Sequence, residues 1–206
     1  RKDTTIMILM KDIIDEYHEN IRKKSEPVTF PLSVEDQKLL DDLMEYVVNS
    51  VDEEKSELYN LRESVGIAAP QVNVLKQLCV IATEDEHGTY AQHAFINPKI
   101  IRHSNFLRYL PVGEGCLSVN RPIEGIVPRY EKITVRNHKA DGTPYNITFE
   151  GYLAVVVQHE IDHLNGILFM DRIDKENPMV PPKNSEPIRF PDEDDFDEDD
   201  FEPINT

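Results

Sequence analysis

The chain has 206 residues, of which 39 are acidic and 22 are basic, so its formal net charge at pH 7 is −17. This length favours one domain with its own hydrophobic core. The two cysteines indicate a reducing, cytoplasmic location rather than a disulfide framework. The excess of acid argues against nucleic acid as a partner, and no apolar run approaches the roughly 20 residues of a transmembrane helix.

The first predicted element is an amphipathic helix that begins after Ser33. Serine is a preferred residue at the N-cap of a helix, and apolar residues then recur at helical spacing over residues 39–48. Residues 51–63 are polar and charged, which predicts a loop. The segment 65–71 is apolar and rich in small residues, and residues 77–83 form the first β-rich run.

Strands fill the middle of the chain, and a second helix follows them. Further β-rich runs lie at residues 94–96, 99–103, 131–138 and 145–149, with a hairpin turn at residues 140–142. Residues 151–165 then form a largely apolar run of helical length that ends at Gly166. These elements predict an α+β fold.

Composition changes near residue 180. Five prolines lie within residues 178–191, which predicts an extended connector. Nine of the eleven residues over 192–202 are acidic, and such a block of like charge cannot bury enough surface to fold by itself. We therefore predict a single folded domain over residues 1–180. A proline-rich connector and a flexible acidic tail follow over residues 181–206.

The second helix carries an H-E-x-x-H motif, His159-Glu160-Ile161-Asp162-His163. Histidines four residues apart lie on the same helical face, so both imidazoles reach one metal ion and the glutamate lies beside the ion's open position. This geometry suits hydrolysis with a carboxylate as the base. Polar side chains in an apolar helix are costly to bury without partners, which favours a metal site over histidines that merely pack in the core.

A catalytic metal site needs a third protein ligand. In the extended pattern H-E-x-x-H-x-x-G-x-x-H, Phe169 stands where the third histidine belongs, so that pattern is not met. Glu186 lies at a plausible distance downstream, but it falls in the proline-rich connector. Cys116 is the stronger candidate, because it lies in a glycine-containing segment, residues 113–118, where the backbone can approach an ion closely.

The remaining cysteine and histidines do not join this set. Cys79 lies in an apolar run and is predicted to be a small buried apolar residue. The other histidines stand in polar or strand-edge contexts and are predicted to lie on the surface: His18, His87, His93, His103 and His138.

Three motifs in order give the chain a resemblance to a known family. They are Val65-Gly66-Ile67-Ala68-Ala69-Pro70-Gln71, Glu114-Gly115-Cys116-Leu117-Ser118 and Gln158-His159-Glu160-Ile161-Asp162-His163. In these motifs the chain resembles the peptide deformylases, from about residue 7 to residue 175, and the polar insertion at 51–63 resembles the longer forms of Gram-positive bacteria. The resemblance implies antiparallel or mixed sheets packed around a central metal-binding helix.

The resemblance also implies a metal-dependent hydrolase that removes the N-formyl group from the formyl-methionine of newly made polypeptides and releases formate. Its metal ligands would be Cys116, His159 and His163. The family's native ion is usually Fe²⁺, with Zn²⁺, Ni²⁺ or Co²⁺ as substitutes, and one thiolate with two imidazoles suits all four. Glu160 would be the base, while the Gln71 side-chain amide and the Leu117 backbone N–H would stabilise the oxyanion.

Substrate recognition follows from the same resemblance. A peptide added as an extra strand would contact the backbone of Val65, Gly66 and Gly115. The methionine side chain would enter a pocket lined by Glu114, Tyr152, Val155, Val156 and His159. The four helical positions among these fall on one face of the helix, which supports this placement, although Val155 and Val156 also fit ordinary core packing.

The chain departs from the family pattern in three places. Ser64 replaces the usual glycine two residues before Gly66 and would be strained if the position requires a positive φ. Residues 17–22, YHENIR, replace the usual H-P-x-L-R. Some members have a basic terminal helix that docks on the ribosome, whereas this chain ends in acid. We therefore predict that the protein does not dock on the ribosome through its tail, so that any ribosome contact is transient. We also predict a monomer.

Two alternative functions remain open. A zinc peptidase would use Glu186 as its third ligand and would keep its metal when Cys116 is replaced. A non-catalytic metal-binding or partner-binding protein would act through the acidic tail, but it would not need Glu160 or Gln71 merely to hold an ion.

Overall fold

A computed structural model of the chain describes residues 7–191, and the acidic tail predicted over 192–206 lies outside the described residues. The α-helices are α1 (Val34–Val51), α2 (Glu53–Tyr59) and α3 (Gly151–Leu164). The strands are β1 (Gly66–Ala68), β2 (Leu78–Glu84), β3 (Tyr90–Ile96), β4 (Lys99–His103), β5 (Leu107–Tyr109), β6 (Arg129–Tyr130), β7 (Lys132–His138), β8 (Pro144–Glu150) and β9 (Ser185–Pro187). Short 3-10 helices are η1 (Met10–Asp12), η2 (Glu19–Arg22), η3 (Ala69–Val72) and η4 (Phe169–Arg172). Within residues 7–191, no helix is both long and apolar enough to cross a membrane.

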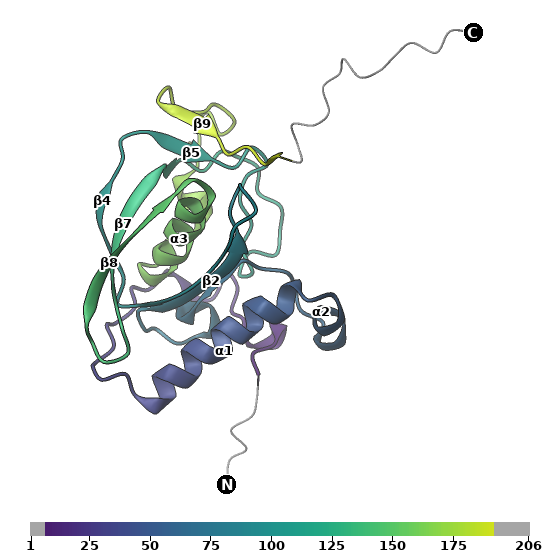
Figure 1. Ribbon diagram of the computed structural model, residues 1–206. Coiled ribbons are helices and arrows are strands. Elements are labelled where there is room, and N and C mark those ends of the chain that lie inside the picture. Colours follow the sequence, from purple (N-terminus) through teal and green to yellow (C-terminus); the bar gives the residue numbers. More distant parts are fainter. Residues whose placement is uncertain (1–6, 192–206) are drawn as a thin grey trace.

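The described strands form three small sheets around α3 (Figure 1). β1, β2 and β3 pair antiparallel in that order, and β4, β7 and β8 form a second antiparallel sheet. In the third sheet, β5 lies between β6 and β9, antiparallel to β6 and parallel to β9. α3 contacts strands of all three sheets. The predicted α+β class with antiparallel and mixed sheets is confirmed.

α1 forms where the sequence predicts a helix. Ser33 caps it, because its Oγ accepts a hydrogen bond from the Asp36 N–H at 3.0 Å. Leu40, Leu43 and Val47 lie on its buried side, and the helix packs against β2 (Figure 1). The helix thus covers one face of the first sheet.

The loop predicted over residues 51–63 is wrong in part, because α2 occupies Glu53–Tyr59. Asp52 caps this helix through a hydrogen bond of 2.9 Å from the Lys55 N–H to its Oδ1, and Asn60 ends it in the left-handed region at φ 53°. No residue of α2 is buried. The helix therefore has no apolar stripe that would reveal it in the sequence.

β2 separates two hydrophobic clusters. Its side chains alternate, so Leu78 and Val80 face the cluster that includes α1, whereas Cys79 and Ile81 face the cluster that includes α3. Cys79 is fully buried, which confirms the prediction for it. Because both faces of β2 are covered, the strand is apolar along most of its length and holds α3 in the interior.

The other predicted elements are also present in the structure. Every β-rich run of the sequence overlaps a strand, in β2, β3, β4, β7 and β8, and Gly142 takes a positive φ of 93° in the hairpin turn. The second predicted helix is α3. β1, β5, β6 and β9 were not predicted as strands, because strands of two or three residues carry no readable alternation.

Part of the segment that follows residue 180, residues 185–188, packs on the body of the protein. Residues 185–187 form β9, which lies beside β5 (Figure 1). Ile188 is fully buried, and its N–H donates to the Tyr109 carbonyl at 2.8 Å. The domain end predicted at residue 180 therefore precedes a segment that belongs to the packed body, which reaches at least residue 188.

Candidate active site

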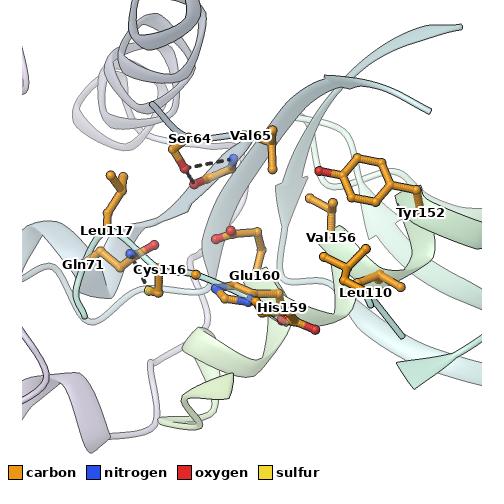
Figure 2. Close-up of a pocket in the computed structure, with 14 residues that line it drawn as sticks. Ser64, Val65, Gln71, Leu110, Cys116, Leu117, Tyr152, Val156, His159 and Glu160 are labelled. Carbon is orange, nitrogen blue, oxygen red and sulfur yellow. Dashed lines mark hydrogen bonds and ion pairs between the residues drawn. The ribbon is translucent and has the colours of Figure 1, made fainter. Parts of the chain in front are cut away.

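A cavity of about 140 Å³ lies beside α3, between β1 and the loop that follows β5 (Figure 2). The predicted site residues that line it are Val65, Gly66, Gln71, Glu114, Gly115, Cys116, Leu117, Tyr152, Val155, Val156, His159 and Glu160. Ser64 and Leu110 complete the wall. Leu110 was not predicted as a site residue. It directly follows β5, and no local pattern in the sequence indicates where that short strand lies.

Cys116, His159 and His163 bring three potential ligand atoms within 4.8 Å of one another. The two histidines are one turn apart on α3, and His163 is buried with its Nε2 3.3 Å from the Cys116 sulfur. Within residues 7–191, this is the only such group of three. Glu186, the ligand that a peptidase would need, instead lies in β9, opposite Arg108 of β5.

The orientation of His159 leaves one ring nitrogen for an ion. Its Nδ1 is 2.8 Å from Glu114 Oε1, and a carboxylate at this nitrogen fixes the ring and directs Nε2 toward the other ligands. One sulfur with two imidazole nitrogens is a donor set that suits Fe²⁺, Zn²⁺, Ni²⁺ and Co²⁺. The residues of this site therefore fit the divalent ion that the motifs imply.

A buried chain of ion pairs holds Glu114 in place. Arg129, whose side chain is 1% exposed, donates to both carboxylate oxygens of Glu114 at 3.0 and 2.8 Å and to Asp162 at 2.6 Å. Arg172 donates to the same Asp162 at 2.6 and 2.7 Å. Burial opposes the charge on Glu114, but Arg129 and His159 outweigh it and lower the pKa of Glu114 to about 2.

The two histidines differ in their affinity for protons. Burial lowers the pKa of His163 well below its usual value, so this ring is neutral, as a metal ligand must be. Burial acts in the same direction on His159, but hydrogen bonds to Cys116 and Glu114 raise the pKa of His159 well above its usual value. An ion bound at His159 would therefore take the place of a proton.

Glu160 is a buried carboxylate with an unused oxygen. It is 4% exposed, and its Oε2 has no hydrogen-bond partner among the described residues. Burial raises the pKa of Glu160 to about 7, which suits a group that accepts and returns a proton near neutral pH. Gly66 leaves it room, because a Cβ at residue 66 would lie 2.8 Å from Glu160 Oε1.

The amide of Gln71 has a fixed orientation. Its Oε1 accepts a hydrogen bond from the Ala68 N–H at 2.9 Å. Its Nε2 consequently points the other way, 3.2 Å from Ser118 Oγ and 3.5 Å from the Cys116 sulfur (Figure 2). An N–H donor is thus held beside the group of metal ligands. Ser118, which supports it, was not predicted as a site residue.

Ser64 takes the place of a glycine without strain. The non-glycine residues with a positive φ within residues 7–191 are Asn60, Asn73 and Asn97, so the backbone of Ser64 is in an ordinary region. The position does not require a positive φ, so the strain considered for a serine there is absent. The Ser64 hydroxyl is bonded to the backbone of Gly66 (Figure 2).

Comparison with known proteins extends the resemblance to most of the chain. Residues 10–179 match the family model described as polypeptide deformylase. The chain is 49% identical to the peptide deformylase of Oceanobacillus iheyensis over 183 residues, which cover 89% of this chain and 100% of that protein. It is 51% identical to the peptide deformylase of Macrococcus caseolyticus over 180 residues, which cover 87% and 98%.

Solved structures show the same fold. A Met-Ala-Ser-bound class I type b peptide deformylase from Acinetobacter baumannii matches with a TM-score of 0.64 at 28% identity, over 82% of this chain and 100% of that chain. Peptide deformylase 1B from Arabidopsis thaliana, in complex with an inhibitor, also matches with a TM-score of 0.64, at 26% identity over 80% and 82%. The three motifs, the arrangement of the sheets around α3 and the span of these matches agree, and the chain belongs to the polypeptide deformylase family.

Proposed function

We propose that this chain is a metal-dependent hydrolase that removes the N-formyl group from the formyl-methionine of newly made polypeptides and releases formate. The observation that carries the proposal is the buried carboxylate of Glu160, whose Oε2 has no hydrogen-bond partner among residues 7–191, in the cavity that the metal-ligand group adjoins. Burying such a group without a partner is costly. A protein that only held an ion would gain nothing from it, which argues against the non-catalytic alternative.

The proposed metal ligands are Cys116, His159 and His163, with Fe²⁺ as the native ion and Zn²⁺, Ni²⁺ or Co²⁺ as substitutes. When bound, the ion would act as a Lewis acid that lowers the pKa of a water molecule and polarises the formyl carbonyl. Metal analysis of protein purified without oxygen tests its identity, because a thiolate ligand is exposed to oxidation in air. Iron is the expected metal, and a stoichiometric content of another ion in such a preparation would contradict this assignment.

The protein's own groups would move the proton and hold the developing charge. Glu160 would accept a proton from the attacking water and deliver it to the amine that leaves. The Gln71 amide, already fixed by the Ala68 N–H, would donate to the oxyanion together with the Leu117 backbone N–H. Each donor of this kind typically contributes about 3–4 kcal/mol to transition-state stabilisation.

The cavity suits an unbranched apolar side chain such as methionine. Val155 and Val156 are 1% and 5% exposed, and both line the cavity, so they serve the pocket as well as the core. Tyr152 adds an aromatic face (Figure 2). Glu114 adds a negative charge to the wall of the cavity, but its ion pair with the buried Arg129 compensates this charge. The peptide beyond methionine would then lie along the open edge of β1.

The proposed substrate also determines the cellular location that we propose. Formylated nascent chains are made in the cytoplasm, so we place the protein there, as a monomer whose acidic tail does not dock on the ribosome. Deleting residues 190–206 should leave sedimentation with ribosomes unchanged. Salt-sensitive ribosome binding that disappears with the tail would contradict this part of the proposal.

Formate release from formyl-Met-Ala-Ser by anaerobically purified protein tests the function, with Glu160→Ala as the blank. Steady turnover is expected for the natural chain, and at least a hundredfold less for the variant with its metal retained. Cys116→Ala should lose the metal, whereas a peptidase that relied on Glu186 would keep it. Metal-loaded natural protein that releases no formate would refute the proposed function.

A further inference from the structure

The pairing of β1 with β2 determines which backbone groups of β1 face outward. β1 is an edge strand, Gly66 lies opposite Ile81, and the Val65 carbonyl accepts a hydrogen bond from the Ala82 N–H at 2.9 Å. In an antiparallel ladder, hydrogen-bonded pairs alternate with pairs whose N–H and C=O point away from the partner strand. The Val65 carbonyl is therefore used inside the sheet, and both backbone groups of Gly66 point to the open edge.

One side chain already binds both of these groups. The Ser64 hydroxyl donates to the Gly66 carbonyl at 2.6 Å, and the Gly66 N–H donates to the same Oγ at 3.3 Å (Figure 2). A peptide that adds as a strand at this edge would pair with the same N–H and C=O. The hydroxyl thus stands where the main chain of a bound peptide would form its hydrogen bonds.

A hydrogen bond to α1 anchors the backbone of Ser64. Its N–H donates to the Ser50 Oγ at 3.1 Å, and Ser50 is a buried residue of α1. Ser64 itself lines the cavity. Because the main chain is anchored and the side chain is short, a rotation about one bond is enough to release Gly66.

We propose that Ser64 sets the affinity for the peptide main chain: its hydroxyl occupies the edge groups of Gly66 in the free protein and must leave when a peptide strand binds. This inference rests on the proposed deformylase function, in which the substrate lies along β1. Each binding event breaks the hydrogen bonds between Ser64 and Gly66. The free energy of these bonds therefore reduces the favourable free energy of peptide binding. The hydroxyl is bonded to Gly66 and not to Glu160, so the chemical step is unaffected.

Ser64→Ala tests this inference, because it removes the hydroxyl and keeps an ordinary backbone. The KM for formyl-Met-Ala-Ser should fall about two- to tenfold, the range of one net hydrogen bond, while kcat changes less than twofold. The dissociation constant of the product peptide Met-Ala-Ser, measured by calorimetry, should fall by the same factor. If the hydrogen bonds of the Ser64 hydroxyl were merely structural, their loss would lower the stability of the protein and leave the dissociation constant of the peptide unchanged.

Two further variants act as controls. Ser64→Thr keeps the hydroxyl and should keep the natural KM. Ser104→Ala is the matched control, because the Ser104 hydroxyl also donates to the carbonyl two residues on, that of Phe106, at 2.9 Å, and Ser104 does not line the cavity. An unchanged or higher KM in Ser64→Ala, or the same fall in Ser104→Ala, would overturn the inference. If the natural protein released no formate, the proposed function would fail, and Met-Ala-Ser binding would still decide the role of Ser64.

Discussion

Gly66 and Glu160 lie far apart in the chain, yet a Cβ at residue 66 would lie 2.8 Å from the Glu160 Oε1, a contact that real Cβ atoms do not make. Gly66→Ala should therefore displace the carboxylate and lower kcat for formate release at least tenfold, since a base must be held in hydrogen-bond reach of its proton. Gly88→Ala is the control, because the space around residue 88 is open, although its φ of +80° costs stability. Equal kcat values in both variants would show that Glu160 tolerates the added methyl group.

Tyr46 provides a prediction about pH. It is 1% exposed, and its hydroxyl donates to the Arg62 carbonyl at 2.8 Å. Burial raises the pKa of Tyr46 from 10 to about 12. Because the folded-state pKa is the higher one, the stability that this group contributes is complete below pH 10 and is lost as the pH rises through about 12. In an ultraviolet absorbance titration, Tyr46→Phe should remove a late ionisation near pH 12. Loss of an early ionisation near pH 10 instead would contradict the prediction.

At the scale of elements, α1 and α2 have similar caps but different packing. Ser33→Ala should lower the free energy of unfolding by about 1 kcal/mol, because α1 packs against β2 and must form in the folded state. Asp52→Ala removes the cap of α2, no residue of which is buried, so this variant should fray that helix and cost less than about 0.5 kcal/mol globally. Urea denaturation measures both values. A larger loss in Asp52→Ala would mean that α2 stabilises the body.

At the scale of the whole molecule, the proposed metal links two segments. Cys116 comes from the loop after β5, and His159 and His163 come from α3. Since binding to the folded state alone stabilises it by about 3 kcal/mol at a hundredfold excess over the dissociation constant, a chelator should lower Tm by roughly 5–10 °C. Cys116→Ala should abolish this shift, whereas Cys79→Ala should keep it, because Cys79 is fully buried outside the group. A shift that persists in Cys116→Ala would rule out the proposed ligand set.

Sequence reasoning succeeded where the signal is local. The spacing of His159 and His163 places both on one face of any helix, and the cap at Ser33 with the apolar spacing after it predicted α1. Cys116 was the stronger candidate for the third ligand because of its glycine-containing segment, although glycines beside a cysteine are only a weak local signal. The resemblance to a family made it the third ligand, and the structure brings its sulfur into the group.

Local patterns in the sequence predict the α+β class, the two long helices, most strands and the three motifs, because periodicity and motif spacing are properties of neighbouring residues. Only the tertiary structure showed that Arg129 joins Glu114 to Asp162 and that β9 lies beside β5. It also showed that the Ser64 hydroxyl binds the outward backbone groups of Gly66. Such contacts depend on which distant segments pack together and on which backbone groups a strand's pairing leaves free. Which segments pack together depends on how the whole chain buries its apolar surface, and a local sequence pattern does not contain this information.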